Sequence, residues 1–187
     1  PGTPTVFAGL NTAVNPYTKE AFHLDEIYLT ELGETSCSVV IPKHRQIKED
    51  LYPGWSEEED NYWTQTYDEA AAWFGLEAVS SFGESFVPTH KATAKKDAGI
   101  SLLKDQMLRR KFFLSDRCVK FAWEIEQYIK NAAGRVPKEN DHLIDCARYA
   151  NAAAGLSLTD EPEVINLKHK GRRAFTIEED LAEDKME

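Results

Sequence analysis

The order of strand-like and helix-like segments is the feature that most limits what this chain can fold into. Residues 5–10 and 21–29 are rich in β-forming residues and are separated by a predicted turn over residues 11–17, so they predict an antiparallel hairpin. Residues 37–41 are either a third strand or the lead-in to a weak helix. Further strand-like runs at 62–67, 85–89 and 112–114 alternate with helical stretches, the clearest at 97–110 and 118–132. The predicted fold is α/β, a mixed sheet with a hairpin start and helices on both faces.

Composition narrows the functional classes. The chain has 187 residues, a length that is enough for one domain with a hydrophobic core. Its net charge of -10 argues against a broad basic surface for binding nucleic acid. A local basic strip beside an acidic metal centre remains compatible with this charge, because bound cations reverse the local field. Three cysteines without a CxxC pair favour reduced thiols. No membrane span, signal peptide or GxxxxGK[ST] phosphate loop is visible, so we expect no membrane partner and no ATPase in this piece.

The amino-acid composition changes near residue 158, so we expect two regions in the chain. Residues 1–158 read as the globular domain, whereas residues 159–187 read as a charged C-terminal extension that is mobile unless a partner holds it. Within the first region, Ile100, Leu103 and Met107 form an apolar stripe at helical spacing, and the aromatic residues are predicted to lie in the core: Trp73, Phe74, Trp123 and Tyr128. The chain starts at Pro1 without Met, so we expect it to be part of a longer protein.

A cluster of polar side chains opens the predicted helix over residues 140–154. Asn140 is a suitable N-cap residue, Asp141 and Asp145 are four residues apart, and His142 lies three before Asp145. These side chains therefore share one end of the helix. They form either one wall of a metal site or a capped surface helix whose acidic first turn suits the helix dipole.

Two further positions can supply ligands to the same edge of the sheet. Asp68 and Glu69 follow the 62–67 strand, and Asn11 follows the first strand. Ligands in α/β proteins gather at the carboxyl ends of strands, although Asp68 is equally suited to capping the helix that follows. Hard divalent cations need oxygen ligands, and a pair of such ions can activate water and stabilise the leaving oxygen of a phosphodiester.

Basic residues occur on both sides of the 97–110 helix. They predict either a strip that contacts DNA phosphates or ordinary solvated helix faces. The residues are Lys91, Lys95, Lys96, Arg109, Arg110 and Lys111.

The order of these motifs resembles that of the nuclease domain of viral (tailed-phage) terminase large subunits. The matching segments are residues 9–11, 67–70, 88–91 with 96–100, and 140–149, and the resemblance covers about residues 5–155. It implies an RNase H-like (RuvC-like) fold and an endonuclease that cuts concatemeric viral DNA during packaging with two Mg²⁺ or Mn²⁺ ions. The implied partners are double-stranded DNA, an ATPase domain in the same full-length chain, the terminase small subunit and the capsid portal, in the host-cell cytoplasm during virus assembly.

The resemblance also implies roles for single residues. Asp68 and Asp145 would bind the metal ions, and His142 would be a further ligand or would orient one. Glu69 and Asp141 would support the ligands. The first-strand ligand should be an aspartate, yet this chain has Asn11, which brings no charge and would weaken metal binding and catalysis.

Three explanations of Asn11 compete: an engineered inactivating change, a natural weakening, or a shifted match in which Asp25 or Glu26 serves instead. The first two are favoured because Asn11 closes the apolar strand. Two other functions stay open beside the endonuclease. One is a catalytically silent, nuclease-like module that binds DNA or the portal, and the other is a related RNase H-like resolvase or transposase core.

Overall fold

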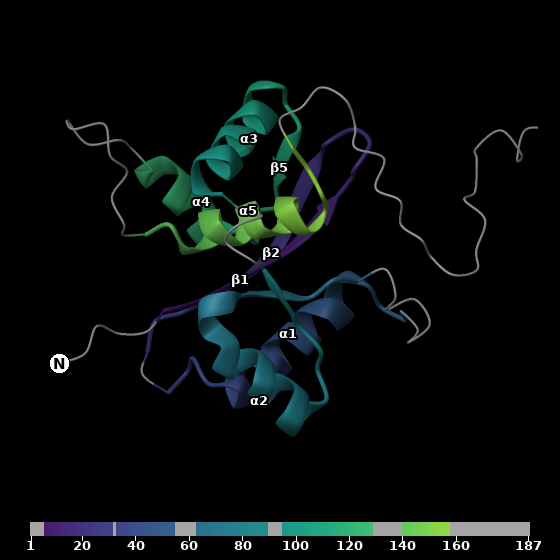
Figure 1. The fold of residues 1–187 in the computed structure, drawn as a ribbon, viewed down its shortest axis with the longest axis vertical. Helices are drawn as coiled ribbons and strands as arrows, with labels where there is room; N and C mark the ends of the chain where they lie inside the picture. The colour runs from purple at the N-terminus through teal and green to yellow at the C-terminus, as the bar shows by residue number, and fades with distance from the viewer. Residues whose placement is uncertain (1–5, 32, 55–62, 90–94, 129–139, 158–187) are drawn as a thin grey trace, which may run out of the picture.

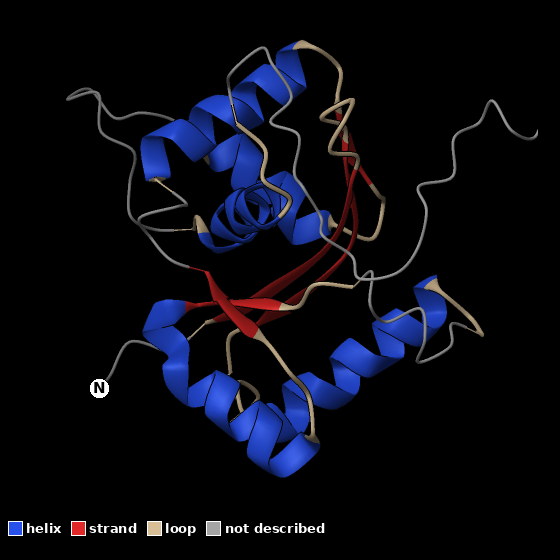
Figure 2. Ribbon diagram, turned by 45° about the vertical axis from the view of Figure 1, so that its right-hand side comes forward, coloured by secondary structure: helices blue, strands red, loops and turns tan. Residues whose placement is uncertain are grey.

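A mixed sheet of three strands and a second sheet of two strands lie between two layers of helices. The structure is a computed structural model, and it describes residues 6–31, 33–54, 63–89, 95–128 and 140–157. Helices α1 (Cys37–Leu51) and α2 (Ala72–Phe82) lie on one side of the strands in Figures 1 and 2. On the other side lie α3 (Lys96–Leu108), α4 (Val119–Gln127) and α5 (His142–Ala153). The predicted α/β class is confirmed.

The predicted hairpin at the start of the chain is present. Strands β1 (Phe7–Val14) and β2 (Ala21–Leu29) pair antiparallel over their whole length. Their turn is held by Asn15, whose side-chain oxygen accepts hydrogen bonds from the backbone N–H groups of Tyr17 and Thr18 at 3.0 and 3.1 Å. An asparagine that bonds its own following backbone is a common way to fix a tight turn.

The first strand is longer than the sequence predicted. We expected a turn from residue 11, but Asn11 lies inside β1, opposite Asp25, and the strand continues to Val14. Residues 12–14 pair with residues 21–23, which satisfies their backbone groups and moves the turn to Asn15. The pairing register shifts between Asn11 and Thr12, so a β-bulge directly follows the proposed first ligand.

Three short strands complete the sheet structure. Strand β5 (Phe112–Leu114) runs parallel to β2, and β3 (Thr66–Asp68) runs parallel to β4 (Val87–Thr89). The predicted strands at 62–67 and 85–89 are therefore present but shorter. The expectation that the first of them is buried was wrong, because β3 is only partly buried along its length. It pairs with a strand of three residues, which leaves much of its surface open.

One core lies between the hairpin and the layer of α1 and α2. Residues 37–41 begin α1, which settles the choice between a strand and a helix lead-in. Helix α2 ends at Gly83, whose φ of 69° is the left-handed conformation that glycine adopts without strain. The buried residues of this core are Ile27, Leu29, Cys37, Val40, Ile41, Phe74 and Ala78.

A second core lies under α3, α4 and α5. Its buried residues are Leu103, Cys118, Phe121, Leu143, Ile144 and Ala147. The predicted stripe on α3 is buried at Leu103 and partly buried at Ile100, but it was wrong at Met107, which is 37% exposed, and Gln106 is buried instead. The side-chain amides of Gln106 and Asn151 exchange hydrogen bonds at 3.0 and 3.3 Å. A paired amide thus takes an interior place that an apolar pattern would give to a hydrophobic residue.

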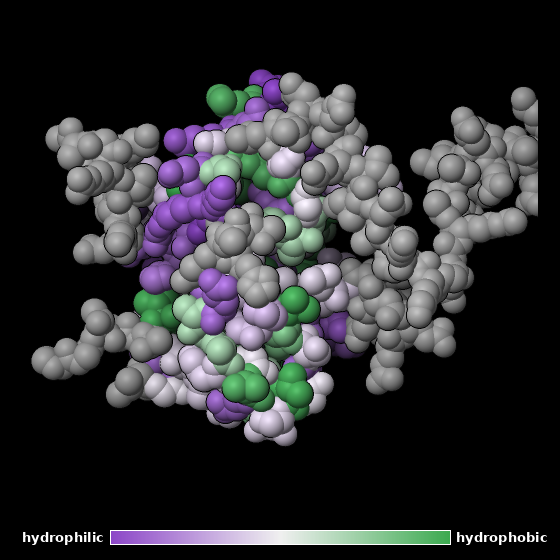
Figure 3. Space-filling model, in the orientation of Figure 1, coloured by the Kyte–Doolittle hydropathy of each residue, from purple (hydrophilic) through white to green (hydrophobic). Residues whose placement is uncertain are grey.

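Two aromatic residues that were predicted to be core lie at the surface. Trp73 and Trp123 are 51% and 38% exposed, whereas Phe74 is buried as expected. Trp73 lies on α2 with the exposed Leu76 and Val79. Hydrophobic residues show at the lower edge of the molecule in Figure 3, and hydrophilic ones gather over the opposite half.

Two helices of the second core, α4 and α5, are capped by carboxylates from residues that are distant in the sequence. Glu26 accepts hydrogen bonds from the N–H groups of residues 120 and 121 at 2.7 and 2.9 Å, at the start of α4. Glu124 of α4 accepts from Leu143 and Ile144 at 2.8 and 3.1 Å, at the start of α5. The prediction that Asn140 caps α5 was therefore wrong. Its φ is 57° and the helix begins two residues later, with the capping oxygen supplied from another helix.

Some expectations fall outside the described residues. Lys91 is among them, and so is the C-terminal extension, so the division at residues 158 and 159 stays a prediction. Within the described ranges, none of the helices combines the length and the apolar character that crossing a membrane requires.

Candidate functional site

Asp68 stands where β3 gives way to helix, and its two carboxylate oxygens have different partners. Oδ1 accepts a hydrogen bond from the N–H of Ala70 at 2.9 Å and so caps the short 3-10 helix η2 (Glu69–Ala71). Oδ2 accepts a hydrogen bond from the Tyr149 hydroxyl of α5 at 2.9 Å. The two interpretations of Asp68, as a cap and as part of a site facing α5, are thus compatible.

Asp145 lies in the first turn of α5 beside a buried arginine. Arg148 donates to Oδ1 of Asp145 through Nε at 3.0 Å and through Nη2 at 2.8 Å. The arginine side chain is only 4% exposed and that of Asp145 is 28% exposed. Within the described part of the chain, the side-chain hydrogen bonds that Asp145 accepts all end on Oδ1. Its second oxygen, Oδ2, therefore has capacity for another partner.

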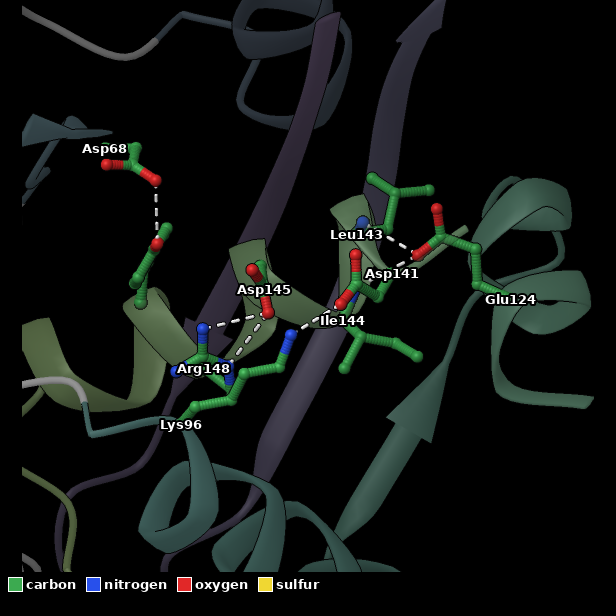
Figure 4. Close-up of polar contacts among 9 residues, drawn as sticks. Asp68, Lys96, Glu124, Asp141, Leu143, Ile144, Asp145 and Arg148 are labelled. Carbon is green, nitrogen blue, oxygen red and sulfur yellow. Dashed lines mark hydrogen bonds and ion pairs between the residues drawn. The ribbon is translucent and has the colours of Figure 1, made fainter. Parts of the chain in front are cut away.

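Arg148 and Tyr149 link these two acids. They are adjacent on α5, and the guanidinium carbon lies 5.2 Å from the centre of the Tyr149 ring, within cation–π range. Figure 4 shows Asp68 and Asp145 on the same side of α5, each joined by a dashed line to a residue of this pair. Two carboxylates that are far apart in the sequence are therefore anchored on one turn of one helix.

The pKa values of Tyr149 and Cys146 on α5 are raised by the same kinds of effect, which are burial and neighbouring carboxylates. Burial, the hydrogen bond to Asp68, and then the charges of Asp68 and Asp145 raise the pKa of Tyr149. Burial raises the pKa of the Cys146 thiol to about 12, and the charges of Asp145, Glu124 and Asp68 add to it. Both carboxylates thus act on the same two side chains of α5, and the positive charge of Arg148 opposes them.

Asp141 is held by a lysine of the neighbouring helix. Its Oδ2 accepts from Lys96 Nζ at 2.6 Å, and the residue is 7% exposed. Burial by itself would lower the pKa of Lys96, but the hydrogen bond that it donates to Asp141 and the charges of Asp145 and Asp141 raise it above its ordinary value. Asp141 therefore ties α3 to the start of α5, and Lys96 has an internal acidic partner.

The other two proposed ligands lie in β1 and at the start of α5. Asn11 is 7% exposed within β1, and α5 packs on this strand, where the Cys146 thiol donates to the carbonyl of Ala8 at 3.5 Å. His142 is the first residue of α5, and its ring lies 6.3 Å from that of Tyr28.

The two acidic alternatives to Asn11 are occupied by other partners. Asp25 accepts from Arg117 at 3.1 Å, and Glu26 caps α4.

The donor types suit a hard divalent cation, since carboxylate and amide oxygens are its usual ligands. In the ranges that the structure describes, no three His, Cys, Asp or Glu side chains are grouped so as to hold a metal ion. Asp68, Asp145 and His142 therefore do not form such a group by themselves, and Asn11 is an amide. Glu69 is exposed beside Asp68.

The described basic residues of the predicted strip lie at the two ends of α3. Lys95 and Lys96 lie at the start of α3, whereas Arg109, Arg110 and Lys111 follow its end, about 20 Å away at the usual rise per residue. Arg109 also pairs with Asp105 at 2.9 Å. A DNA-binding role for these residues stays a prediction, and Lys91 lies outside the described ranges.

Sequence reasoning missed three residues that shape this site. Arg148 carried a local signal, because it follows Asp145 by three residues on one helix face. Tyr149 and Glu124 carried none, because their partners lie on other elements.

Comparison with known proteins places the fold. No protein-family model and no curated protein matches the sequence. Among solved structures, the large-terminase (g2p) nuclease domain of bacteriophage SPP1 with bound Mn is similar with a TM-score of 0.59 and 15% identity, over 80% of each chain. The large terminase of a thermophilic bacteriophage, solved in complex with ATP-gamma-S, has a TM-score of 0.50 and 14% identity, over 80% of this chain and 40% of its own.

These likenesses define the architecture as RNase H-like. More particularly, the chain has the fold of the nuclease domain of a phage large terminase, as the motif order predicted. It corresponds to less than half of the large terminase from the thermophilic phage.

Proposed function

We propose that this chain is the metal-dependent DNA endonuclease domain of a viral genome-packaging terminase. The observation that carries the proposal is the anchoring of Asp68 and Asp145 on adjacent residues of α5, at 2.9 Å through Tyr149 and 2.8 Å through Arg148. The likeness in fold to a nuclease domain solved with Mn supports the same conclusion.

The proposed ligands of two Mg²⁺ or Mn²⁺ ions are Asp68, Asp145, Asn11 and His142. When bound, such ions activate water and stabilise the leaving oxygen of a phosphodiester. The protein's own contribution is to fix the acids: Ala70 and Tyr149 hold Asp68. Arg148 holds one oxygen of Asp145 and leaves the other for a ligand. Glu69 and Asp141 are the residues proposed to support these ligands.

Asn11 weakens the proposed centre in this chain. An amide oxygen can contact a cation, but it carries no charge, so we expect lower metal affinity and slower cleavage than with an aspartate there. The proposed partners are double-stranded DNA, an ATPase domain in the same full-length chain, the terminase small subunit and the capsid portal. The proposed place of action is the host-cell cytoplasm during virus assembly. The likeness to part of a large terminase solved with ATP-gamma-S supports the ATPase partner.

Plasmid cleavage in the presence of Mn²⁺ tests this proposal. We expect weak nicking by the chain itself, faster cleavage by Asn11→Asp, and no cleavage when Asp145→Asn or Asp68→Asn is added to that variant. Asp105→Asn is the matched control, because this aspartate lies on α3 and pairs with Arg109 at the surface. A folded Asn11→Asp variant that stays inert with Mn²⁺ would refute the catalytic proposal.

A nuclease-like module that binds DNA or the portal without cutting is the second candidate. It is favoured by the neutral Asn11 and by the internal partners that both acids already have. In that case DNA would bind with an ordinary salt dependence, and Asp145→Asn would not change the affinity. Cleavage of branched DNA but not of linear duplex would instead indicate a resolvase-like core.

A further inference from the structure

Arg148 contacts a proposed ligand but is itself shielded from any substrate. Its side chain is 4% exposed, so it has no access to a DNA phosphate outside the protein. Its Nε and Nη2 groups both donate to Oδ1 of Asp145, at 3.0 and 2.8 Å. Two charge-assisted bonds from a rigid planar group fix the orientation of a carboxylate better than one bond from a flexible ammonium would.

A glycine of a neighbouring helix leaves the space that the Arg148 side chain occupies. At Gly99 of α3, an added Cβ would lie 2.9 Å from Cδ and 3.1 Å from Cγ of Arg148. These atoms belong to the stem of the side chain, so they cannot move aside without moving the guanidinium. Glycine inside a helix is unfavourable by about 1 kcal/mol relative to alanine. The room that the arginine stem needs therefore explains why a glycine stands at this position of α3.

Tyr149 does for Asp68 what Arg148 does for Asp145. Its hydroxyl donates to Oδ2 of Asp68 at 2.9 Å, and the Arg148 guanidinium lies over its ring. Because the two residues are consecutive on α5, a shift of this turn moves both acids together (Figure 4).

We infer that Arg148 and Tyr149 are positioning residues of the proposed metal centre, and that Gly99 leaves the space that fixes the position of the Arg148 side chain. This inference rests on the proposed function. The pair turns Oδ2 of Asp145 and the carboxylate of Asp68 toward the bound ions. Loss of the partners that orient a ligating carboxylate typically weakens metal binding by about 10–100-fold.

Mn²⁺ affinity, measured by electron paramagnetic resonance of the free ion, tests the inference on the full chain. We expect Kd to rise about 10–100-fold in Arg148→Lys and Tyr149→Phe. Gly99→Ala should also raise Kd, although the change favours the helix itself. Arg45→Lys and Tyr17→Phe are the matched controls, since these side chains lie at the surface. We expect them to bind Mn²⁺ as the parent does.

Urea unfolding without metal separates positioning from packing. A purely structural role predicts lower stability with an unchanged Kd in the folded fraction. Kd values within twofold of the parent in Tyr149→Phe and Gly99→Ala would overturn the inference, even if Arg148→Lys does not fold.

Asp68→Ala and Asp145→Ala distinguish failure of the inference from failure of the proposed function. If they abolish Mn²⁺ binding while the positioning variants bind normally, only the inference fails. If the parent binds no Mn²⁺, or if these two variants bind it unchanged, both proposals fail.

Discussion

Replacement of Glu124 by leucine tests whether the start of α5 depends on a carboxylate from another helix. Glu124 is fully buried, and its Oε2 accepts the N–H groups of Leu143 and Ile144 at 2.8 and 3.1 Å. Leucine fills a similar volume but leaves both donors without a partner, and each orphaned donor costs about 1–3 kcal/mol.

Part of this loss is offset because the leucine variant no longer has to bury a carboxylate. Burial raises the pKa of Glu124 against the opposing backbone hydrogen bonds, and its Oε1 has no hydrogen-bond partner within the described structure. We therefore expect a net loss of about 2 kcal/mol in the free energy of unfolding for Glu124→Leu. Glu124→Gln retains an acceptor oxygen, so it should lose less than about 1 kcal/mol.

Urea unfolding at neutral pH, followed by far-ultraviolet circular dichroism, gives these free energies if the slope with urea is unchanged. Amide hydrogen exchange locates the effect, since the N–H groups of Leu143 and Ile144 should exchange faster in Glu124→Leu than in Glu124→Gln. Equal stabilities of the leucine and glutamine variants, with equal protection of these two amides, would refute the capping argument.

Buried contacts elsewhere in the protein lead to three further predictions. Gly75→Ala should lower the free energy of unfolding by about 1–3 kcal/mol, because its Cβ would lie 2.7 Å from Cζ of Tyr67; urea unfolding measures this, and an unchanged midpoint would contradict it. Burial lowers the pKa of His23 from 6.5 to about 3, so the unfolded chain binds a proton below pH 6.5 that the folded chain does not. This group should therefore contribute a fall in stability of about 1.4 kcal/mol between pH 7.5 and pH 5.5. The pH dependence should be smaller by about this amount in His23→Phe, and the pKa of His44, which burial also lowers, accounts for a remaining fall. Asn11→Asp places a buried carboxylate opposite the partly buried Asp25, so thermal unfolding without metal should show a loss of at least about 1 kcal/mol that Mn²⁺ reverses.

Local patterns were sufficient for the hairpin and for the polar start of α5. The turn residue Asn15 and the alternation of residues 21–29 determine β1 and β2 because both signals act over a few residues. The spacing of Asp141, His142 and Asp145 likewise survives folding, since a helix fixes which residues share a face.

Contacts between distant elements could not be predicted in this way. The cap of α5 comes from Glu124, the hydroxyl bonded to Asp68 comes from Tyr149, and the space for Arg148 comes from Gly99. Each depends on how helices pack, and no local spacing encodes it. The buried Gln106 shows the same limit, because a paired amide in a core looks like a surface residue in the sequence.

A crystal structure of the chain soaked in Mn²⁺, with anomalous scattering used to find the ion, tests the central claim most directly. The account predicts Mn²⁺ bound to Asp68 and to Oδ2 of Asp145, with Tyr149 and Arg148 still holding the same two side chains. Well-ordered crystals with no anomalous peak within coordination distance of both aspartates would contradict it.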